Sequence, residues 1–531
     1  MATNKKSRTN SGISQYTGVW NEDTVRHLLR RAHFGVKVED VATFKAKTMS
    51  QAVDDILDID YTVPSPPVNY YESTNPDPRV NLGDTWVDDY NSQLNNVRMR
   101  SFKRWWAGQI VNHDSTIREK MVLFWHNHFS TQTQVYGWPN FGYDYLKLIR
   151  SNCLKNFKTL TKDMTTNPAM LVFLNGERNT KTAPDENYSR ELQELFTLGK
   201  GPDSKYTEDD VIAGARVLTG WRVRRTDGTS YFQSNRHDEG DKKFSSFYND
   251  TIITGKTGNA GADEVDDLLN MIFAQNEVAK HIVRKLYRWF IYYEIDSDTE
   301  TNVITPLANI FRSNSYEIKP VLEALFKSQH FYDVANRHAL LKSPADFTFG
   351  LARSFDIDFP AETEYNSLYT AWNFLLGSAS SQQQNLGDPP SVAGWSPYYQ
   401  IPQYHELWIN SDTLPKRNQI TDRMIASGYN INGFRFKIDT LQYAAKFPNP
   451  EDPNKLIDDM LTHLHTLEVS QKQKDYMKTI LLSGQINDSY WTDAWNSYVA
   501  DPTNTSKATT VSSRLIFLVK YLMNLGEFQL S

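Results

Sequence analysis

The sequence has little cysteine, no long apolar run and no excess of basic charge, and each of these features excludes a class of protein. Its single cysteine, Cys153, cannot form an intramolecular disulfide or a cysteine-rich zinc site, and it is compatible with a reducing or an oxidising compartment. The longest apolar runs, such as LIFLVKYLM at 515–523, are shorter than the roughly 20 residues that a helix needs to cross a bilayer. With 57 basic and 63 acidic side chains, the formal charge of −6 gives no electrostatic footprint for nucleic acid. We therefore expect a soluble protein with no membrane span and no nucleic-acid partner.

The polar N-terminus, MATNKKSRTNSGISQY, also lacks the apolar stretch of a signal peptide, so the sequence does not by itself indicate export and leaves the compartment open. Aromatic residues are abundant, with 13 Trp, 28 Tyr and 27 Phe making 13% of the chain. Such residues serve for core packing or for stacking on sugars and other rings. We expect most of them to pack in a core, which a chain of 531 residues can build on a large scale.

Helix signatures recur along the chain and have recognisable ends. Asn21 is a candidate N-cap whose helix stops at Gly35, and Asn167 with Pro168 begins a helix that we expect to end at Gly176. Two further helices are expected to open on Thr207, with Asp210 three residues later, and on Ser343-Pro344. The predicted fold is mainly α: a large multi-helical body with irregular excursions and at most a short β-hairpin near 222–256.

The irregular excursions divide the chain into predicted parts. Residues 1–20 are expected to be a flexible N-terminus, and 21–342 a main helical domain that carries the candidate site. Residues 343–531 are expected to form a C-terminal helical part that packs on the first and includes an aromatic loop at 376–418. Long loops often carry function, so this loop and the excursion at 222–256 are of interest.

The stretch MVLFWHNHF places His126 and His128 two residues apart. Thr116 and Glu119 fit a capping box, which predicts a helix from about 117 to these histidines. Residues i and i+2 of a continuing helix point about 200° apart, so the two imidazoles can share a metal ion only if the helix ends there. In the second His-x-His pair, His463 and His465 lie within an uninterrupted amphipathic helix, and we expect these two to diverge and to be solvated.

Two further clusters contain ligand-type side chains. Glu191 and Glu194 lie on one stripe of a predicted helix in APDENYSRELQELFTLGKG, and two carboxylates that face inward need a cation or a shared proton. On the surface, pairing of Arg190 with Glu186 and Glu194 would explain the same residues as ordinary salt bridges. His237 and Asp238, in NRHDEGDKKF, are either metal ligands or a solvated charge cluster. His33, in RRAHFG, is more typical of a helix C-terminal histidine.

Several motifs together resemble a large bacterial family known as the domain of unknown function 1800 family. The motifs are, in chain order, LLRRAHFG, WHNHF, NPAMLVFL, ENYSRELQELFTLG, YTEDDVIAGARVLTGW, HDEGDKKF, PPSVAGW and EFQLS. The resemblance covers nearly the whole chain, from about residue 21 to 531. It implies no agreed activity, but its members usually look exported and often accompany a sulfatase-like protein, which is a candidate partner. Matching positions are His33, His126, His128, Glu186, Asn187, Arg190, Glu191, Glu194, His237, Asp238 and Trp395, whereas His463 and His465 do not match. The chain departs from the family in Asp185, where Asn is usual, in the Phe that ends DEGDKKF, and in lacking an export signal.

The first functional hypothesis is a metal-dependent enzyme, most simply a hydrolase that uses a divalent ion to activate water. Zinc, manganese or iron would be the cofactor, and a carboxylate-bridged redox centre is the weaker branch because the Glu-x-x-His spacing of di-iron bundles is missing. The substrate would be a small molecule or a carbohydrate. The predicted metal ligands are His126, His128, Glu191 and His237; the predicted catalytic residues are Glu194, Asp238 and Arg190; and the predicted substrate-binding residues are Trp125, Tyr188, Asn187, Trp221 and Trp395.

The second hypothesis is a non-catalytic helical binding or assembly protein for a carbohydrate or cell-surface polymer. In that case the polar clusters are structural and hold helix register without any ion. The binding surface would then be the aromatic stretch that contains Trp395, Tyr398, Tyr399 and Trp408. Metal-ligand geometry discriminates between the two hypotheses.

Overall fold

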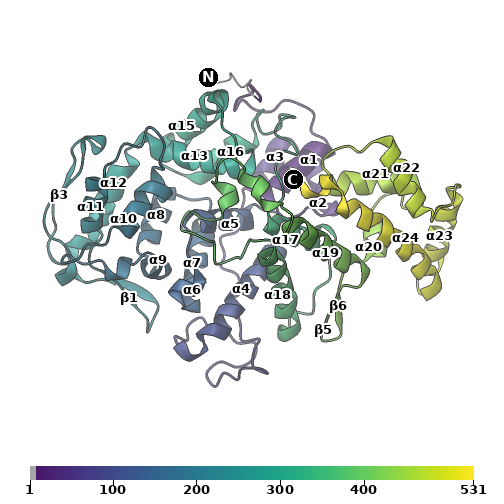
Figure 1. The fold of residues 1–531 in the computed structure, drawn as a ribbon, viewed down its shortest axis with the longest axis horizontal. Helices are drawn as coiled ribbons and strands as arrows, with labels where there is room; N and C mark the ends of the chain where they lie inside the picture. Colours follow the sequence, from purple (N-terminus) through teal and green to yellow (C-terminus); the bar gives the residue numbers. More distant parts are fainter. Residues whose placement is uncertain (1–7) are drawn as a thin grey trace.

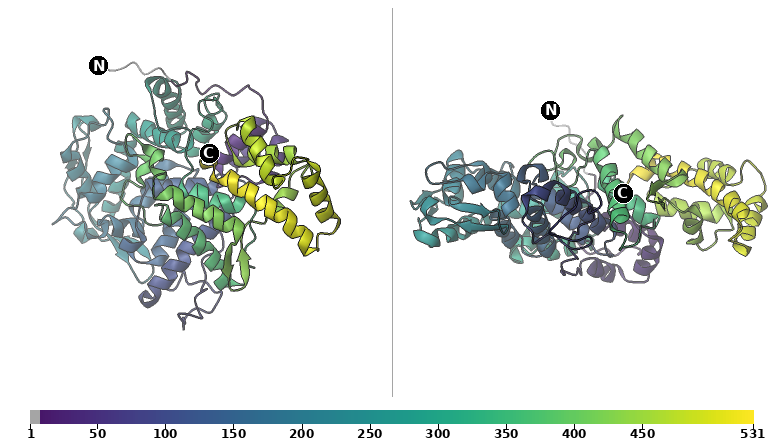
Figure 2. Two further views of the ribbon diagram at one scale, coloured as in Figure 1. Left: turned by 45° about the vertical axis from the view of Figure 1, so that its right-hand side comes forward. Right: turned by 90° about the horizontal axis from the view of Figure 1, so that it is seen from below.

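The structure is a computed structural model that describes residues 8–531, and its helices form three groups along one long axis (Figure 1). One end holds two hairpins and five helices: β1 (Trp221–Arg224) with β2 (Thr229–Phe232), β3 (Lys242–Lys243) with β4 (Ile252–Ile253), α8 (Phe157–Thr165), α9 (Pro168–Phe173), α10 (Asn187–Glu191), α11 (Glu208–Val217) and α12 (Glu264–Phe273). The middle holds α1 (Glu22–Ala32), α2 (Val38–Lys45), α3 (Met49–Ile56), α4 (Asn95–Val111), α5 (Arg118–His128), α6 (Thr133–Tyr136), α7 (Pro139–Asn152), α13 (Asn276–Phe290), α14 (Ser297–Thr299), α15 (Thr305–Ser313), α16 (Ile318–Phe326), α17 (Pro344–Ser354), α18 (Tyr365–Ser381) and α19 (Thr413–Ala426). The other end holds β5 (Tyr429–Ile431) with β6 (Phe434–Phe436), α20 (Thr440–Ala445), α21 (Pro453–Leu464), α22 (Gln471–Leu481), α23 (Ser489–Ala500) and α24 (Thr505–Asn524). The view from below in Figure 2 shows the same order along the long axis.

The prediction of a mainly α fold is confirmed, and the excursion at 222–256 does contain β structure. Strands β1 and β2 pair antiparallel there, and so do the two-residue strands β3 and β4. The limit of one short hairpin near 222–256 is wrong, because β5 and β6 form another hairpin. Their connection is Asn432-Gly433, with φ of 51° and 90°. An Asn-Gly pair between β-rich runs is a strong local hairpin signal, so the sequence did contain the information.

The predicted helix starts are largely confirmed. Asn21 accepts a hydrogen bond from the backbone N–H of Thr24, and Thr207 forms a capping box with Asp210. Asn167 caps α9, with Pro168 at the first helical position, and Ser343 caps α17 in the same way. These starts could be read from the sequence because a cap uses only residues three or fewer positions away.

One predicted helix cap and one predicted helix end are wrong. Glu119 does not cap α5; it forms a buried ion pair with Arg150 of α7, and no side chain caps the helix start at Ile117. Helix α9 ends at Phe173, before the expected end at Gly176, and Asn175 takes a left-handed conformation with φ of 61°. For Glu119, a contact outside the local sequence pattern determines the geometry.

The parts on either side of residue 342 share one hydrophobic core. Buried apolar side chains from Val25 to Phe528 form a continuous cluster, and α18 packs along α4 (Figure 1). The division into 21–342 and 343–531 stays a prediction. The shared core extends across the boundary at residue 342. Of the predicted flexible N-terminus, residues 1–7 lie outside the described residues, whereas the backbone N–H of Tyr16 donates to the carbonyl of Lys327 at 2.8 Å.

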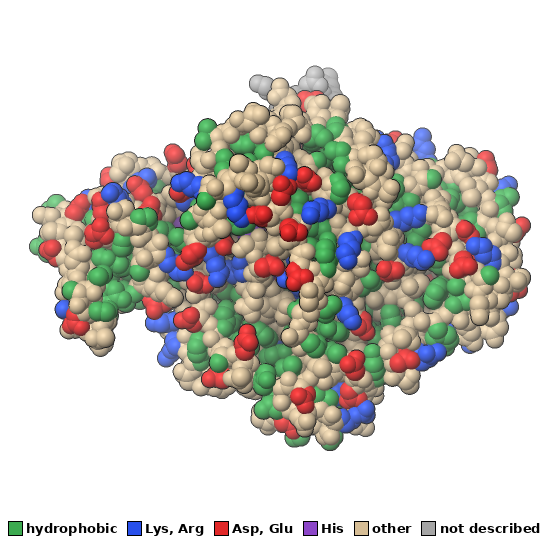
Figure 3. Space-filling view, turned by 180° about the vertical axis from the view of Figure 1, so that it is seen from behind, with side chains coloured by type: hydrophobic (Ala, Val, Ile, Leu, Met, Phe, Trp, Pro, Cys, Tyr) green, Lys and Arg blue, Asp and Glu red, His purple; other side chains and the backbone are tan. Residues whose placement is uncertain are grey.

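Charged side chains of both signs are interspersed on the face shown in Figure 3, with no large field of one sign. Within residues 8–531, no helix is both long and apolar enough to cross a membrane.

Candidate functional site

His126 and His128 end α5 and point to different neighbours. The ring of His126 lies among Trp106, Tyr145 and Trp395, with Nδ1 3.1 Å from the Tyr145 hydroxyl. Burial lowers the pKa of His126 to about 3, so the ring is neutral, and its Nε2 has no hydrogen-bond partner. The helix continues through His128 instead of ending before it, so the two rings do not converge on one ion as a metal site would require.

Both ring nitrogens of His128 are occupied by protein groups. Nε2 lies 3.1 Å from the carbonyl oxygen of Phe196, and the amine of Lys285 lies 3.0 Å from Nδ1. Because a carbonyl only accepts, Nε2–H is the donor and Nδ1 accepts from Lys285. Burial lowers the pKa of both groups, that of Lys285 to about 7. Neither nitrogen of His128 is left for a metal.

Glu191 and Glu194 come together where α10 changes into a π-helix, Leu192–Thr197. Burial, and next the charge of Glu194, raise the pKa of Glu191, and one of its oxygens is buried without a partner. Glu194 forms an ion pair with Lys200. Arg190 turns to the surface, where it pairs with Glu186 and Glu208. Of the two alternatives that the sequence left open, partial burial describes Glu191 and the salt-bridged surface describes Arg190.

His237 belongs to a fully buried network with Glu264 of α12 and Lys242 of β3. Its Nε2 lies 3.1 Å from one oxygen of Glu264, and the Lys242 amine donates to the other at 2.6 Å. Its Nδ1 lies 3.0 Å from the carbonyl oxygen of Thr219. The neighbouring Asp238 accepts hydrogen bonds from the guanidinium of Arg216 at 2.7 and 3.1 Å. The Lys242 ammonium is paired with the Glu264 carboxylate inside this network, and sequence reasoning missed Glu264, which gives no local signal.

The predicted aromatic wall for a substrate is not formed. Trp125 and Trp395 are 0% and 1% exposed, and Trp125 donates its indole N–H to the carbonyl of Cys153 at 2.8 Å. Tyr188 is buried and donates to Thr165, while Asn187 and Trp221 remain partly exposed. In the aromatic loop, Tyr398 stacks on Trp289 and Trp408 is buried, while Tyr399 is exposed. The buried rings pack against other parts of the protein and cannot stack on a ligand. This finding corrects the prediction of an aromatic wall for a substrate.

The prediction that His463 and His465 are solvated is also wrong. They are 5% and 3% exposed; Nε2 of His463 donates to the carbonyl of Val36 at 2.8 Å, and Nε2 of His465 to that of Leu522 at 2.9 Å. Segments that α21 contacts far along the chain cover both residues. Across residues 8–531, no group of three or more His, Cys, Asp or Glu side chains is arranged to hold a metal ion. The metal hypothesis therefore stays a prediction without an assembled ligand set.

Two of the hollows in the described part of the chain bear on function. The first is a groove of about 610 Å³ between α18, α19 and β5, here called the α18–α19 groove. Its lining includes Asn373, Phe374, Gly377, Gln419 and Tyr429. The second, here called the cationic cavity, consists of two adjoining chambers of about 40 Å³ each, which share Arg30 and Asp346.

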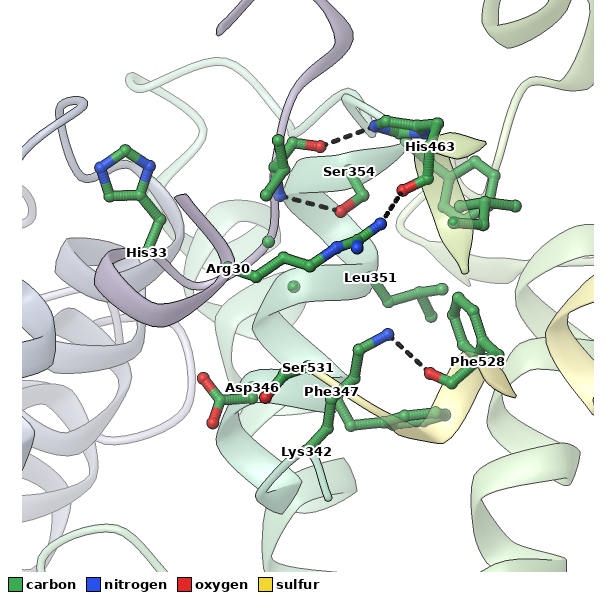
Figure 4. A pocket seen from close by; sticks show the side chains of 15 residues that line it. Arg30, His33, Lys342, Asp346, Phe347, Leu351, Ser354, His463, Phe528 and Ser531 are labelled. Carbon is green, nitrogen blue, oxygen red and sulfur yellow. Dashed lines mark hydrogen bonds between the residues drawn. The ribbon is translucent and has the colours of Figure 1, made fainter. Parts of the chain in front are cut away.

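The cationic cavity lies where α1, α17 and α21 meet, and Figure 4 shows its first chamber. Arg30 reaches from α1 and donates to the carbonyls of His463 and His465 at 2.9 and 2.8 Å, at the C-terminal end of α21. Lys342 lies on the opposite side of the space and donates to the carbonyl of Phe528 at 2.6 Å (Figure 4). Charged side chains of the second chamber are Arg31, Lys120 and Arg288. Sequence reasoning missed this cavity, although LLRRAHFG supplies two of its arginines.

The close approach of helices that forms the first chamber depends on Gly35. This residue has a φ of +81°, and a Cβ atom there would lie 2.5 Å from the carbonyl oxygen of Gly350 in α17. Glycine therefore allows the end of α1 to rest against α17, which brings Arg30 and Arg31 to Asp346.

The fold and these hollows define a large helical protein with internal polar networks and without an assembled metal centre among the described residues. The chain belongs to the family described as protein of unknown function (DUF1800), whose match covers residues 27–530. The predicted resemblance is confirmed. A comparison with curated proteins found no match, and a comparison with solved structures found none either.

Proposed function

We propose that this protein is a non-catalytic helical binding protein that takes a carbohydrate-type ligand in the α18–α19 groove. The supporting observation is the groove itself. Its volume of about 610 Å³ lies in the usual range for small-ligand sites, roughly 300–1,000 Å³. The partly exposed rings of Phe374 and Tyr429 provide apolar surface, and amides such as Gln419 provide hydrogen-bonding groups for hydroxyls.

The polar clusters support a structural role rather than catalysis. The nitrogens of His128 and His237 bond to protein groups, and Asp238 is held by Arg216. A buried polar network in which the groups satisfy one another fixes helix packing without needing an ion.

Gly377 offers a direct test of the groove. It lies in α18, and an added Cβ would meet no atom within 4 Å, so a large side chain can enter the groove without straining the core. We expect Gly377→Phe to keep the thermal unfolding midpoint and to abolish glycan binding measured by calorimetry or on a glycan array. Gly526→Phe is the matched control, since its Cβ also meets nothing within 4 Å and Gly526 does not line the groove. Equal glycan binding by the wild type and Gly377→Phe would refute the proposal.

The metal-dependent hydrolase is the second candidate, and one observation favours it. Glu191 is partly buried beside Glu194 and has an oxygen without a partner, which is an unfavourable arrangement that a cation would relieve. Metal analysis of the purified protein, described below, tests this candidate separately from glycan binding.

A further inference from the structure

The charged side chains that line the cationic cavity are almost all positive. Arg30, Arg31, Lys120, Lys342 and Arg288 carry the positive charge, and Asp346 is the one acidic side chain among the lining residues, which also include the last residue, Ser531. The Asp346 carboxylate already has partners, because it forms an ion pair with Lys120 and accepts a hydrogen bond from the Ser343 hydroxyl at 2.9 Å. The cavity therefore contains more positive charge than its own residues neutralise.

Arg31 carries the least satisfied of these charges. It is 3% exposed, and one nitrogen, Nη2, donates to the carbonyl of Asn336 at 3.1 Å. Its Nε and Nη1 are buried and have no hydrogen-bond partner. A guanidinium presents donors in a planar fork that matches two oxygens of a phosphate or carboxylate group. Arg31 thus offers that fork to the second chamber.

Arg30 and Lys342 are held by neutral acceptors. Arg30 and Lys342 bond to backbone carbonyls, which carry only partial charge. The nearby histidines do not change the net charge of the cavity. Burial lowers the pKa of His463 to about 3 and that of His405 to about 4, so both rings are uncharged. Burial is the main cause that lowers the pKa of Lys342 to about 7 and that of Arg31 to about 9, and the charge of Asp346 offsets part of the shift in both.

The size of the cavity limits what can neutralise it. Each chamber has about 40 Å³, and a water molecule needs on the order of 10–15 Å³. A chamber therefore accommodates a few non-hydrogen atoms, which suits a tetrahedral oxyanion and excludes a sugar ring. Arg30 also lines a wider groove of about 640 Å³ with Arg26 and Arg337, so a larger molecule could lie outside while its anionic group enters.

We propose that the second chamber of the cationic cavity is a binding site for a tetrahedral oxyanion, phosphate or sulfate, coordinated by Arg31 and Arg30, which both line it. The oxyanion arrives either as the free ion or as the ester group of a larger molecule in the outer groove. This site is separate from the α18–α19 groove and does not depend on the carbohydrate proposal.

The test measures binding of sodium phosphate, sodium sulfate and a sugar phosphate monoester to the full chain by isothermal titration calorimetry, with sodium chloride as the control ion. We expect one site per chain for phosphate or sulfate. Binding of the free ions alone assigns a free-ion site, and tighter binding of the monoester assigns the ester group of a larger ligand. No oxyanion binding tighter than about 1 mM would overturn the proposal.

Arg31→Met distinguishes a binding residue from a structural one. In anion-free buffer we expect this variant to be at least as thermally stable as the wild type, because it removes an unpaired buried charge. It should also lose the rise in unfolding temperature that phosphate causes in the wild type, and bind phosphate at least about tenfold more weakly. Arg312→Met, at a partly exposed arginine that bonds to Asn309, is the matched control and should retain both. A variant that is less stable without anion yet binds phosphate normally would show that Arg31 is only structural.

Discussion

Glu264→Leu tests whether the His237 cluster is a structural network. The Glu264 carboxylate accepts hydrogen bonds from His237 at 3.1 Å, from the Lys242 amine at 2.6 Å and from the backbone N–H of Lys256 at 2.7 Å. The side chains of His237, Lys242 and Glu264 are 0% exposed. Leucine would leave the Lys242 ammonium buried without a counter-charge, and removing one partner of a buried pair costs about 3–5 kcal/mol.

A double variant separates the charge from the packing. Replacing Lys242 with Met in the Glu264→Leu background removes the stranded ammonium and leaves apolar side chains of similar volume, a change that is often neutral or stabilising. We therefore expect the double variant to regain most of the lost stability. The assay is urea unfolding followed by circular dichroism, with hydrogen exchange to localise the change to residues 237–264. A single variant that loses less than about 1 kcal/mol, or a double variant that is no more stable than the single one, would refute this reasoning.

The same network predicts a pH dependence. Burial raises the pKa of Glu264, but hydrogen bonds from His237 and Lys242 outweigh it and hold the pKa below the ordinary value of 4.5. A lowered carboxyl pKa contributes stability that is present above 4.5 and is lost as the pH falls through the folded-state pKa. The stability difference between the wild type and Glu264→Leu should accordingly be largest above pH 4.5 and shrink in more acidic buffer.

Four further predictions follow from other sites. Trp395→Ala should lower stability by about 3–5 kcal/mol in urea unfolding, because it empties a fully buried site; a cost within 0.5 kcal/mol or so would contradict the packing role. Gly35→Ala should destabilise by at least about 1 kcal/mol, since it combines a φ of +81° with a clash against Gly350, and unchanged stability would contradict the close approach. Burial lowers the folded-state pKa of Lys342 to about 7 from 10.5, so the folded state binds fewer protons between these values and anion-free stability should rise with pH across that window. Lys342→Met should abolish that rise, and an equal slope in both proteins would exclude Lys342 as its cause. Elemental analysis of untagged protein should find no stoichiometric zinc, manganese or iron if the polar clusters are structural; metal that disappears in Glu191→Gln would instead support the hydrolase candidate.

Helix boundaries and hairpins were largely predictable, since their causes are local. Asn21, Thr207 and Ser343 cap their helices through residues within three positions, and β1 and β2 lie where turn residues flank β-rich runs. The Asn432-Gly433 hairpin was equally readable in principle. Glu119 shows the limit, because its partner Arg150 lies 31 residues away and overrides the capping pattern.

The sequence by itself determined which side chains have ligand chemistry, where most helices begin, and that aromatic residues would fill a large helical core. Only the tertiary structure decided what those side chains bond to. The partner of His237 is 27 residues away, that of His128 is 157 away and that of His463 is 427 away. A hydrogen bond or a desolvated charge depends on distance in space, and the periodicity of one helix carries no information about which distant segment will cover it. The cationic cavity has the same origin, since Arg31, Lys120 and Lys342 come together around Asp346 only after α1, α5 and the start of α17 have packed together.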